Sequence, residues 1–239
     1  MSYRKWNHAG VNLFFTLTTV VINFAFAFAI VATCQWASAH HFGLLYIVPL
    51  PTWAFVLAGL LLLDLISAWL IHWIEHQTRW MWQFHTIHHI DRNVDVTTAN
   101  RHHPVESVFR AFFTLLAVFV TGAPIWVLML YQSFSVLFSQ FNHANIRLPH
   151  RFDRALSWVI VSPDMHKVHH HFARPYTDSN YGNIFSLWDR LFGTFLYLPP
   201  SSLRYGLDTH MSEKDSIGVL LGVPFQPYRA RPKNSPAKG

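Results

Sequence analysis

Two long apolar stretches stand out along the chain. Residues 11–33 contain no charged side chain, and residues 52–74 contain one acidic residue, Asp64. About 20 consecutive apolar residues can cross a bilayer, so each stretch predicts a membrane-spanning helix. The first is too long for the apolar part of a signal peptide, and we expect it to be retained. Burying an acidic side chain at that depth in the membrane costs free energy. Asp64 therefore has either a functional role or a partner that offsets this cost, such as a Ser or Trp donor.

A third apolar region, residues 107–141, is interrupted at Gly122-Ala123-Pro124. The runs 111–121 and 125–138 on either side are each too short to cross a bilayer comfortably. A proline between them breaks a helix. We therefore expect a broken helical hairpin that returns to its starting side.

The polar stretches on either side of the hairpin, residues 75–106 and 143–225, predict a helical cap. The fold class is then all-α: an integral membrane helical bundle of about two full spans plus the hairpin, covered by this cap. We expect residues 1–225 to form a single domain. Residues 226–239, rich in Pro, Lys and Arg, are expected to be a disordered basic tail.

The composition agrees with a protein that is solvated partly by lipid. Apolar residues make up 51% of the chain and charged residues only 13%, about half the charged fraction of a soluble domain. The formal charge is +6, and the basic residues lie next to apolar spans, which favours anionic lipid headgroups over nucleic acid as a partner. Cys34 is the only cysteine, which excludes an internal disulfide and a thiolate metal site.

The distribution of charge predicts an orientation. The loop 34–51 contains no Lys, Arg, Asp or Glu. The basic residues therefore lie on the other side of the predicted spans, which the positive-inside rule assigns to the cytoplasm. We expect the N-terminus, the cap and the C-terminus to be cytoplasmic.

The 17 histidines form clusters with the spacing of metal ligands. In His72-Trp73-Ile74-Glu75-His76, two histidines four residues apart share one helical face. Two further clusters both have the pattern H-x-x-H-H, in which the adjacent pair is offset by about 100° and can address different metals. Together the three clusters supply the candidate ligands His72, His76, His85, His88, His89, His166, His169 and His170.

Other histidines and acidic residues extend this prediction. In the motif Arg101-His102-His103-Pro104 we expect His103 to be a ligand and His102 to point away, and we add His143 at the exit of the hairpin. Neutral imidazole binds iron, zinc, copper and nickel, and this many rings fits two metals rather than one. Side chains that could orient the rings are Glu75, Asp164, Asp178 and Asn145, together with Asp91, Asp95 and Glu106. We expect His171 to lie behind the ligands and to support them. We expect the following histidines to lie at the membrane interface or in solvent: His8, His40, His41, His150 and His210.

The order of these motifs resembles the fatty acid hydroxylase/sterol desaturase superfamily. The segments 180–184 and 188–194, which follow the last histidine motif, are also similar to that family, and the resemblance covers about residues 52–200. It implies a membrane-bound oxidoreductase with two iron ions held only by histidines, which uses dioxygen and external electrons to hydroxylate or desaturate a lipid such as a fatty acyl chain or a sterol-like lipid. The implied ligands are His72, His76, His85, His88, His89, His103, His143, His166, His169 and His170.

The resemblance also bears on the electron donor, because some members of the family carry a fused cytochrome b5 domain. This chain has no room for one, so we expect a separate cytochrome b5-like or ferredoxin-like protein.

Two alternatives to a lipid oxidoreductase remain. The motif His72-x-x-Glu75-His76 matches an inverted zinc-protease signature, with Glu75 as general base of a zinc-dependent membrane hydrolase. A non-enzymatic metal-binding or haem-binding membrane protein is the other, although transport favours ligands deeper in the spans.

Overall fold

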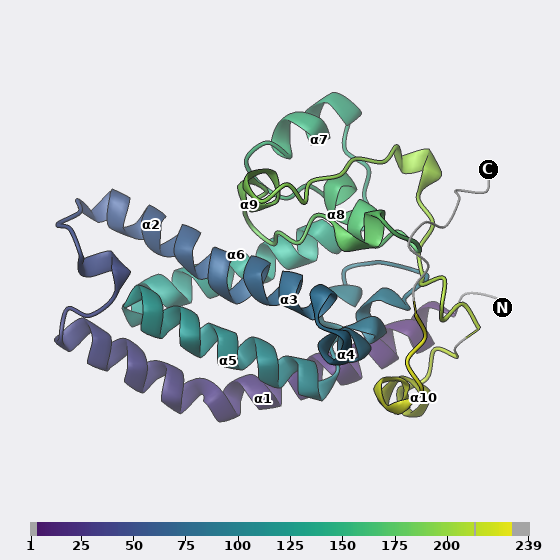
Figure 1. Cartoon of the computed structure of the whole chain (residues 1–239), viewed down its shortest axis with the longest axis horizontal. Helices are drawn as coiled ribbons and strands as arrows, with labels where there is room; N and C mark the ends of the chain where they lie inside the picture. The colour runs from purple at the N-terminus through teal and green to yellow at the C-terminus, as the bar shows by residue number, and fades with distance from the viewer. Residues whose placement is uncertain (1–3, 213, 231–239) are drawn as a thin grey trace.

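The computed structural model describes residues 4–212 and 214–230. Within these residues the chain is helical, with two isolated β-bridges and no β-strand, which confirms the predicted all-α class. The long helices lie along one another, and the shorter helices gather at one end of them (Figure 1). Three helical segments in the described part have the length and apolar composition to cross a membrane: Lys5–Tyr46, Thr52–Gln77 and Pro104–Thr121.

The two predicted spans lie in the first two of these segments. Helix α1 covers Lys5–Ala39. Helix α2 (Thr52–Asp64), a π-helical turn η2 (Leu65–Leu70) and α3 (Ile71–Gln77) follow one another without a break and form a second rod. The π-helical turn lies directly before His72, and such turns are frequent at functional sites.

The predicted hairpin consists of α5 (Pro104–Thr121) and α6 (Ile125–His143), which return the chain to the cap side. Both helices are longer than the apolar runs from which they were predicted, and α5 alone is long enough to cross a membrane. The added turns carry polar side chains that face the protein interior, among them Glu106 and Asn142. Counting apolar residues therefore underestimated the length of these helices.

Two glycines allow the loops at the far end of the bundle to meet. Gly122 ends α5 with φ +72°, and Gly43, just before the short 3-10 turn η1 (Leu44–Tyr46), has φ +111°. A Cβ atom on Gly122 would lie 1.9 Å from the carbonyl oxygen of Phe42. The positive φ and the close approach both require glycine here.

The cap is built from short helices joined by tight turns. Its elements are α4 (Arg79–His89), η3 (Thr98–Asn100), α7 (His150–Leu156), α8 (Pro163–His169), η4 (Tyr176–Asp178), α9 (Leu187–Leu191), η5 (Pro200–Ser202), α10 (Ile217–Gly222) and η6 (Val223–Phe225). Asp64, the acidic residue in the second span, joins this cap to the bundle. Its carboxylate accepts hydrogen bonds from the backbone N–H groups of Ile184 and Phe185 and from Trp188 Nε1, each at 3.2 Å. Of the two explanations for Asp64, the pairing with a Trp donor is the one observed.

Two histidines that we expected at the interface or in solvent are buried instead. His8 forms an ion pair with Asp91 at 2.9 Å, and His210 lies 2.8 Å from the hydroxyl of Thr209. His8 is covered because the cap folds over the start of α1. His40, His41 and His150 are exposed.

The beginning of the predicted disordered tail also contacts the cap. Gln83 donates to the carbonyl oxygen of Gln226 at 3.3 Å, and Arg229 donates to that of Thr209 at 3.0 Å. Residues 226–230 therefore have a defined place in the structure. The remainder of that prediction, residues 231–239, lies outside the described residues.

Candidate metal centre

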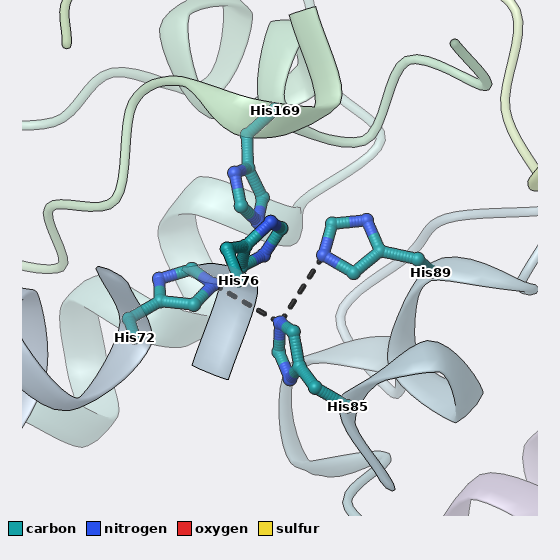
Figure 2. Close-up of side chains that lie close together, drawn as sticks. All are labelled: His72, His76, His85, His89 and His169. Carbon is teal, nitrogen blue, oxygen red and sulfur yellow. Dashed lines mark hydrogen bonds between the residues drawn. The ribbon is translucent and has the colours of Figure 1, made fainter. Parts of the chain in front are cut away.

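The fold brings nine of the ten predicted ligands into two adjoining groups. Within each group, one nitrogen from every ring lies within 4.8 Å of the others, and all the residues are buried. The first group, called site A, consists of His72, His76, His85, His89 and His169. The second group, called site B, consists of His88, His143, His166 and His170. Figure 2 shows how the five rings of site A converge from three segments of the chain.

Helical periodicity divides the two H-x-x-H-H motifs between the sites. On α4, His85 and His89 are four residues apart and both belong to site A, whereas His88 belongs to site B. On α8 the assignment is reversed: His166 belongs to site B together with His170, one residue beyond the helix. Neighbouring histidines thus point to different sites, as the 100° offset allows.

Backbone carbonyls fix the tautomers of several rings. His72 Nδ1 donates to the carbonyl oxygen of Tyr181 at 2.9 Å, and His169 Nδ1 donates to that of Ser179 at 2.7 Å. A carbonyl oxygen only accepts, so Nδ1 carries the hydrogen and Nε2 of the neutral ring keeps its lone pair. The sequence gives no signal for these contacts, because any residue can supply a carbonyl.

The Nε2 lone pairs that result point at one another, and a cation between them would stabilise this arrangement. His85 Nδ1 donates to Glu106, so the Nε2 atoms of His72 and His85, 3.1 Å apart, both present lone pairs. Two lone pairs at this distance repel unless a cation lies between them. Nitrogens bound to one metal at about 2.0–2.1 Å are themselves about 3 Å apart. The residues of site A therefore fit a bound metal ion.

In site B one ring is fixed in the same way. His143 Nδ1 lies 2.8 Å from the carbonyl oxygen of Ser139 and must donate to it. Its Nε2 lone pair then lies 3.1 Å from Nε2 of both His166 and His170. Four nitrogens converge here without an acidic side chain among them. Site B therefore also fits a metal ion, with fewer protein ligands than site A.

Two buried glutamates and an arginine support site A. Glu106 accepts from His85 Nδ1 at 2.8 Å and from Arg110 Nε at 3.1 Å. Glu75 is fully buried and paired with Arg110, and its carboxylate is 3.7 Å from His85 Nδ1. The guanidinium thus neutralises part of the charge of both carboxylates, and Glu106 orients the His85 ring.

Of three other predicted orienting residues, one contacts a ligand ring, one is buried elsewhere and one is exposed. Asp178 lies 3.1 Å from His76 Nδ1, as expected of a carboxylate that orients a ligand ring. Asp164 is buried and lies 3.4 Å from the amine of Lys167, three residues further along α8. Asn145 is exposed, because the chain leaves α6 at His143 and runs to the surface.

Neither His103, which we expected to be a ligand, nor His102, which we expected to point away, belongs to either histidine group. Pro104 is the first residue of α5, so His103 occupies the N-cap, where its Nδ1 accepts from the N–H of Val105 at 3.1 Å. The ring of His102 lies 5.4 Å from that of His88 and lines the cavity described below. His171, which we expected to support the ligands, accepts from the N–H of Arg204 at 3.3 Å.

Burial keeps the cap histidines in their neutral form. Desolvation lowers the pKa of His88, His89, His166, His169 and His170 well below the ordinary histidine value. A protonated imidazole cannot bind a metal, whereas a neutral one can. These rings are therefore ready to bind metal at neutral pH.

A cavity of about 370 Å³ opens beside the histidines and extends between α1, α5 and α6. Its cap end is bounded by His72, His88, His143 and His166, from both sites. Its other end is apolar and lies among the spans, where Ile30 and Ile125 line it. A hydrocarbon chain placed there would reach the metal centre from the bilayer.

The fold and the site define a helical membrane protein with two adjoining all-histidine groups that could hold metal ions at the end of a bundle cavity. Residues 56–194, more than half of the chain, match the fatty acid hydroxylase family. The chain belongs to this family. The matched region contains all the histidines of both sites.

Curated relatives are enzymes that act on different lipids. The chain is 26% identical to the ornithine lipid hydroxylase OlsE of Rhizobium tropici, over 64% of this chain and 45% of that protein. It is 31% identical to the alkylglycerol monooxygenase of Xenopus tropicalis, over 58% of this chain and 30% of that protein. It is 28% identical to the very-long-chain aldehyde decarbonylase GL1-11 of Oryza sativa subsp. indica, over 64% of this chain and 58% of that protein. The chain thus spans less than two thirds of these relatives, and no solved structure matches it significantly.

Proposed function

We propose that this protein is a membrane-bound di-iron oxidoreductase that hydroxylates or desaturates a C–H bond of a lipid. The observation that carries the proposal is the pair of converging imidazole groups at the end of a cavity that reaches between the spans. One ion would be held by His72, His76, His85, His89 and His169, and the other by His88, His143, His166 and His170. Bound iron would supply the reaction of dioxygen with an unactivated C–H bond. His103 is left out of this ligand set.

The chain itself orients the histidine rings and excludes water from the site. Carbonyl oxygens and carboxylates behind five of the nine rings, those of His72, His76, His85, His143 and His169, hold these rings in place, which leaves them little rearrangement on metal binding. The rings are buried, and the cavity beside them is the route by which a lipid reaches them. Site B, with four histidines, leaves more open positions for oxygen or water than site A.

The electrons are proposed to come from a separate cytochrome b5-like or ferredoxin-like protein that binds on the cap side. The loop 40–51, which joins α1 to α2, contains no charged residue, whereas Arg and Lys residues occur throughout the cap segments. The positive-inside rule then favours a cytoplasmic cap and metal centre. A protease-protection assay on sealed vesicles would test this orientation.

The experiment that tests the function is anaerobic reconstitution with labelled ferrous iron, followed by oxygen, a reductant and membrane lipids. We expect a Mössbauer signal of about two coupled irons per chain and an oxygenated or desaturated lipid by mass spectrometry. One iron per chain, or no lipid product from any lipid class, would contradict the proposal.

The zinc-hydrolase alternative loses its general base in the structure. Glu75 is fully buried and its carboxylate is bound by Arg110, so it does not face a water on the metal. The substitution Glu75→Gln separates the two functions. A hydrolase would lose nearly all activity, whereas we expect a lipid oxygenase to keep most of it.

A further inference from the structure

Two amide side chains line the cavity at mid-depth, Asn23 on α1 and Gln132 on α6. The neighbouring polar side chains of the lining are already paired. Thr19 and Ser107 share a hydrogen bond of 2.8 Å, and Ser135 accepts one from an asparagine of the cap at 2.8 Å. Asn23 and Gln132 have no hydrogen-bond partner in the described part of the chain, and their amide groups are open to whatever fills the cavity.

The two amides lie at similar distances from the metal centre. Gln132 precedes His143 by eleven residues on α6, which is about 16 Å at the rise of an α-helix. On the other wall, Ser107 lies five residues after His102, and its partner Thr19 is one turn before Asn23. These steps place Asn23 about 13 Å from the metal end. Both amides therefore belong to one level of the cavity.

Apolar side chains lie next to the two amides, since Leu128 and Met129 of α6, about one turn before Gln132, line the same part of the cavity. An amide offers two donors and an acceptor, and facing them with hydrocarbon leaves them unpaired at considerable cost. Polar side chains in spans are accordingly rare and commonly mark a binding site. A plain acyl chain would satisfy neither Asn23 nor Gln132.

The cavity also offers a path for such a ligand from the bilayer. Helix α1 packs along α5, whereas α6 packs mainly on α2 and α8. Asn23 on α1 is exposed, and Met129 on α6 keeps 59% of its surface accessible. The cavity is therefore open between α1 and α6, in the part of the bundle that faces lipid.

We propose that the cavity binds a lipid with a hydrogen-bonding oxygen, a hydroxyl, carbonyl or ester group, about a dozen bonds from the carbon at the metal centre. Asn23 and Gln132 bind this oxygen. The bond count follows from the distance of about 13–16 Å, since an extended chain advances about 1.1–1.2 Å per bond. The proposal rests on the proposed function only for the reaction at the metal end.

The test compares the binding of octadecanoic acid and 12-hydroxyoctadecanoic acid to the full-length protein in nanodiscs by native mass spectrometry. With the carboxyl group at the metal end, the 12-hydroxyl lies at the level of the amides. We expect the wild type to bind the hydroxylated chain roughly 3- to 10-fold more tightly, as one or two hydrogen bonds provide. The isomer 3-hydroxyoctadecanoic acid, whose hydroxyl lies at the metal end, is expected to show no such gain.

The variants Asn23→Leu and Gln132→Leu are each expected to reduce the preference for the 12-hydroxyl. Gln140→Leu, on the same helix but outside the cavity lining, is the matched control and should keep it. Equal binding of both chains by the wild type would overturn the proposal. So would a preference that survives in both variants, or a change of oligomeric state in place of a change in binding, because the amides would then pair with a second copy.

The binding assay needs neither oxygen nor electrons, so its failure is distinct from failure of the proposed function. A retained 12-hydroxyl preference in a protein without turnover would contradict only the proposed function. Turnover of plain acyl chains with no preference would contradict only the substrate assignment. Two variants on different helices keep the test decisive if one of them does not fold.

Discussion

The contact between Glu106 and His85 gives the sharpest prediction about site A. Glu106 is fully buried, and its Oε1 accepts from His85 Nδ1 at 2.8 Å and from Arg110 Nε at 3.1 Å. The substitution Glu106→Gln keeps the shape of the side chain but removes the charge that makes His85 a stronger ligand. Loss of such a supporting contact lowers metal affinity by about 10- to 100-fold. This corresponds to about 1.4–2.7 kcal/mol.

The assay is a metal titration against a competing chelator, with metal stoichiometry measured by mass spectrometry. We expect the metal of site A to be lost first, while site B keeps its ion. Glu75→Gln is the matched control, because Glu75 also binds Arg110 but is 3.7 Å from His85 Nδ1, beyond hydrogen-bond distance. Equal losses in the two variants would refute our reasoning, since the effect would then come from the charge of Arg110 and not from the orientation of the ring.

Four further predictions test other parts of the structure. His143→Ala should abolish binding of one metal. His103→Ala should leave both metals bound and lower only the melting temperature, by an amount typical of a lost helix cap. Equal metal loss in the two variants would contradict the assignment of His143 as a ligand and of His103 as a helix cap. Asp64→Leu leaves three donors without an acceptor and should destabilise the protein by about 3 kcal/mol or more, measured by thermal unfolding in detergent, with Asp64→Asn less severe. Gly122→Ala should cost at least about 1–2 kcal/mol in the same assay, through its positive φ and the clash at Phe42, and an unchanged melting temperature would contradict the observed turn. Because burial lowers the pKa of the cap histidines, protons compete with metal only well below about pH 6.5, so bound metal should persist at pH 6 and be released as the pH falls further.

The spans and the histidine groups were predictable because each follows a simple period. An uninterrupted apolar run predicts a spanning helix, and the spacing of i, i+3 and i+4 places His85, His88 and His89 on one side of a helix. The chemical need for these rings to meet His166 further required the hairpin to double back. The confirmed hairpin shows that a ligand constraint can decide topology where hydropathy alone does not.

The contacts behind the rings could not be predicted in this way. Tyr181 and Ser179 act through their carbonyl oxygens, which have no sequence signature. Neighbouring histidines were also hard to separate: residue 103 was favoured as a ligand, yet Pro104 makes it a helix cap and leaves His102 beside His88. Sequence spacing gives the periodicity of a helix but not the residue at which the helix begins.

Helices α4 and α8 each supply histidines to both sites, which links the positions of the two sites. Helix α4 gives two rings to site A and one to site B, and α8 with its following residue does the reverse. A shift of either helix would therefore disturb both sites. The segment after α8 is in turn held to the bundle by Asp64 and by Asp189, which accepts from Trp69 Nε1 and from the N–H of Tyr181. The same segment carries the Tyr181 carbonyl that orients His72, so docking of the cap and geometry of site A depend on the same contacts. The two buried carboxylates, which belong to neither histidine group, thereby couple the membrane-spanning rod to the metal centre.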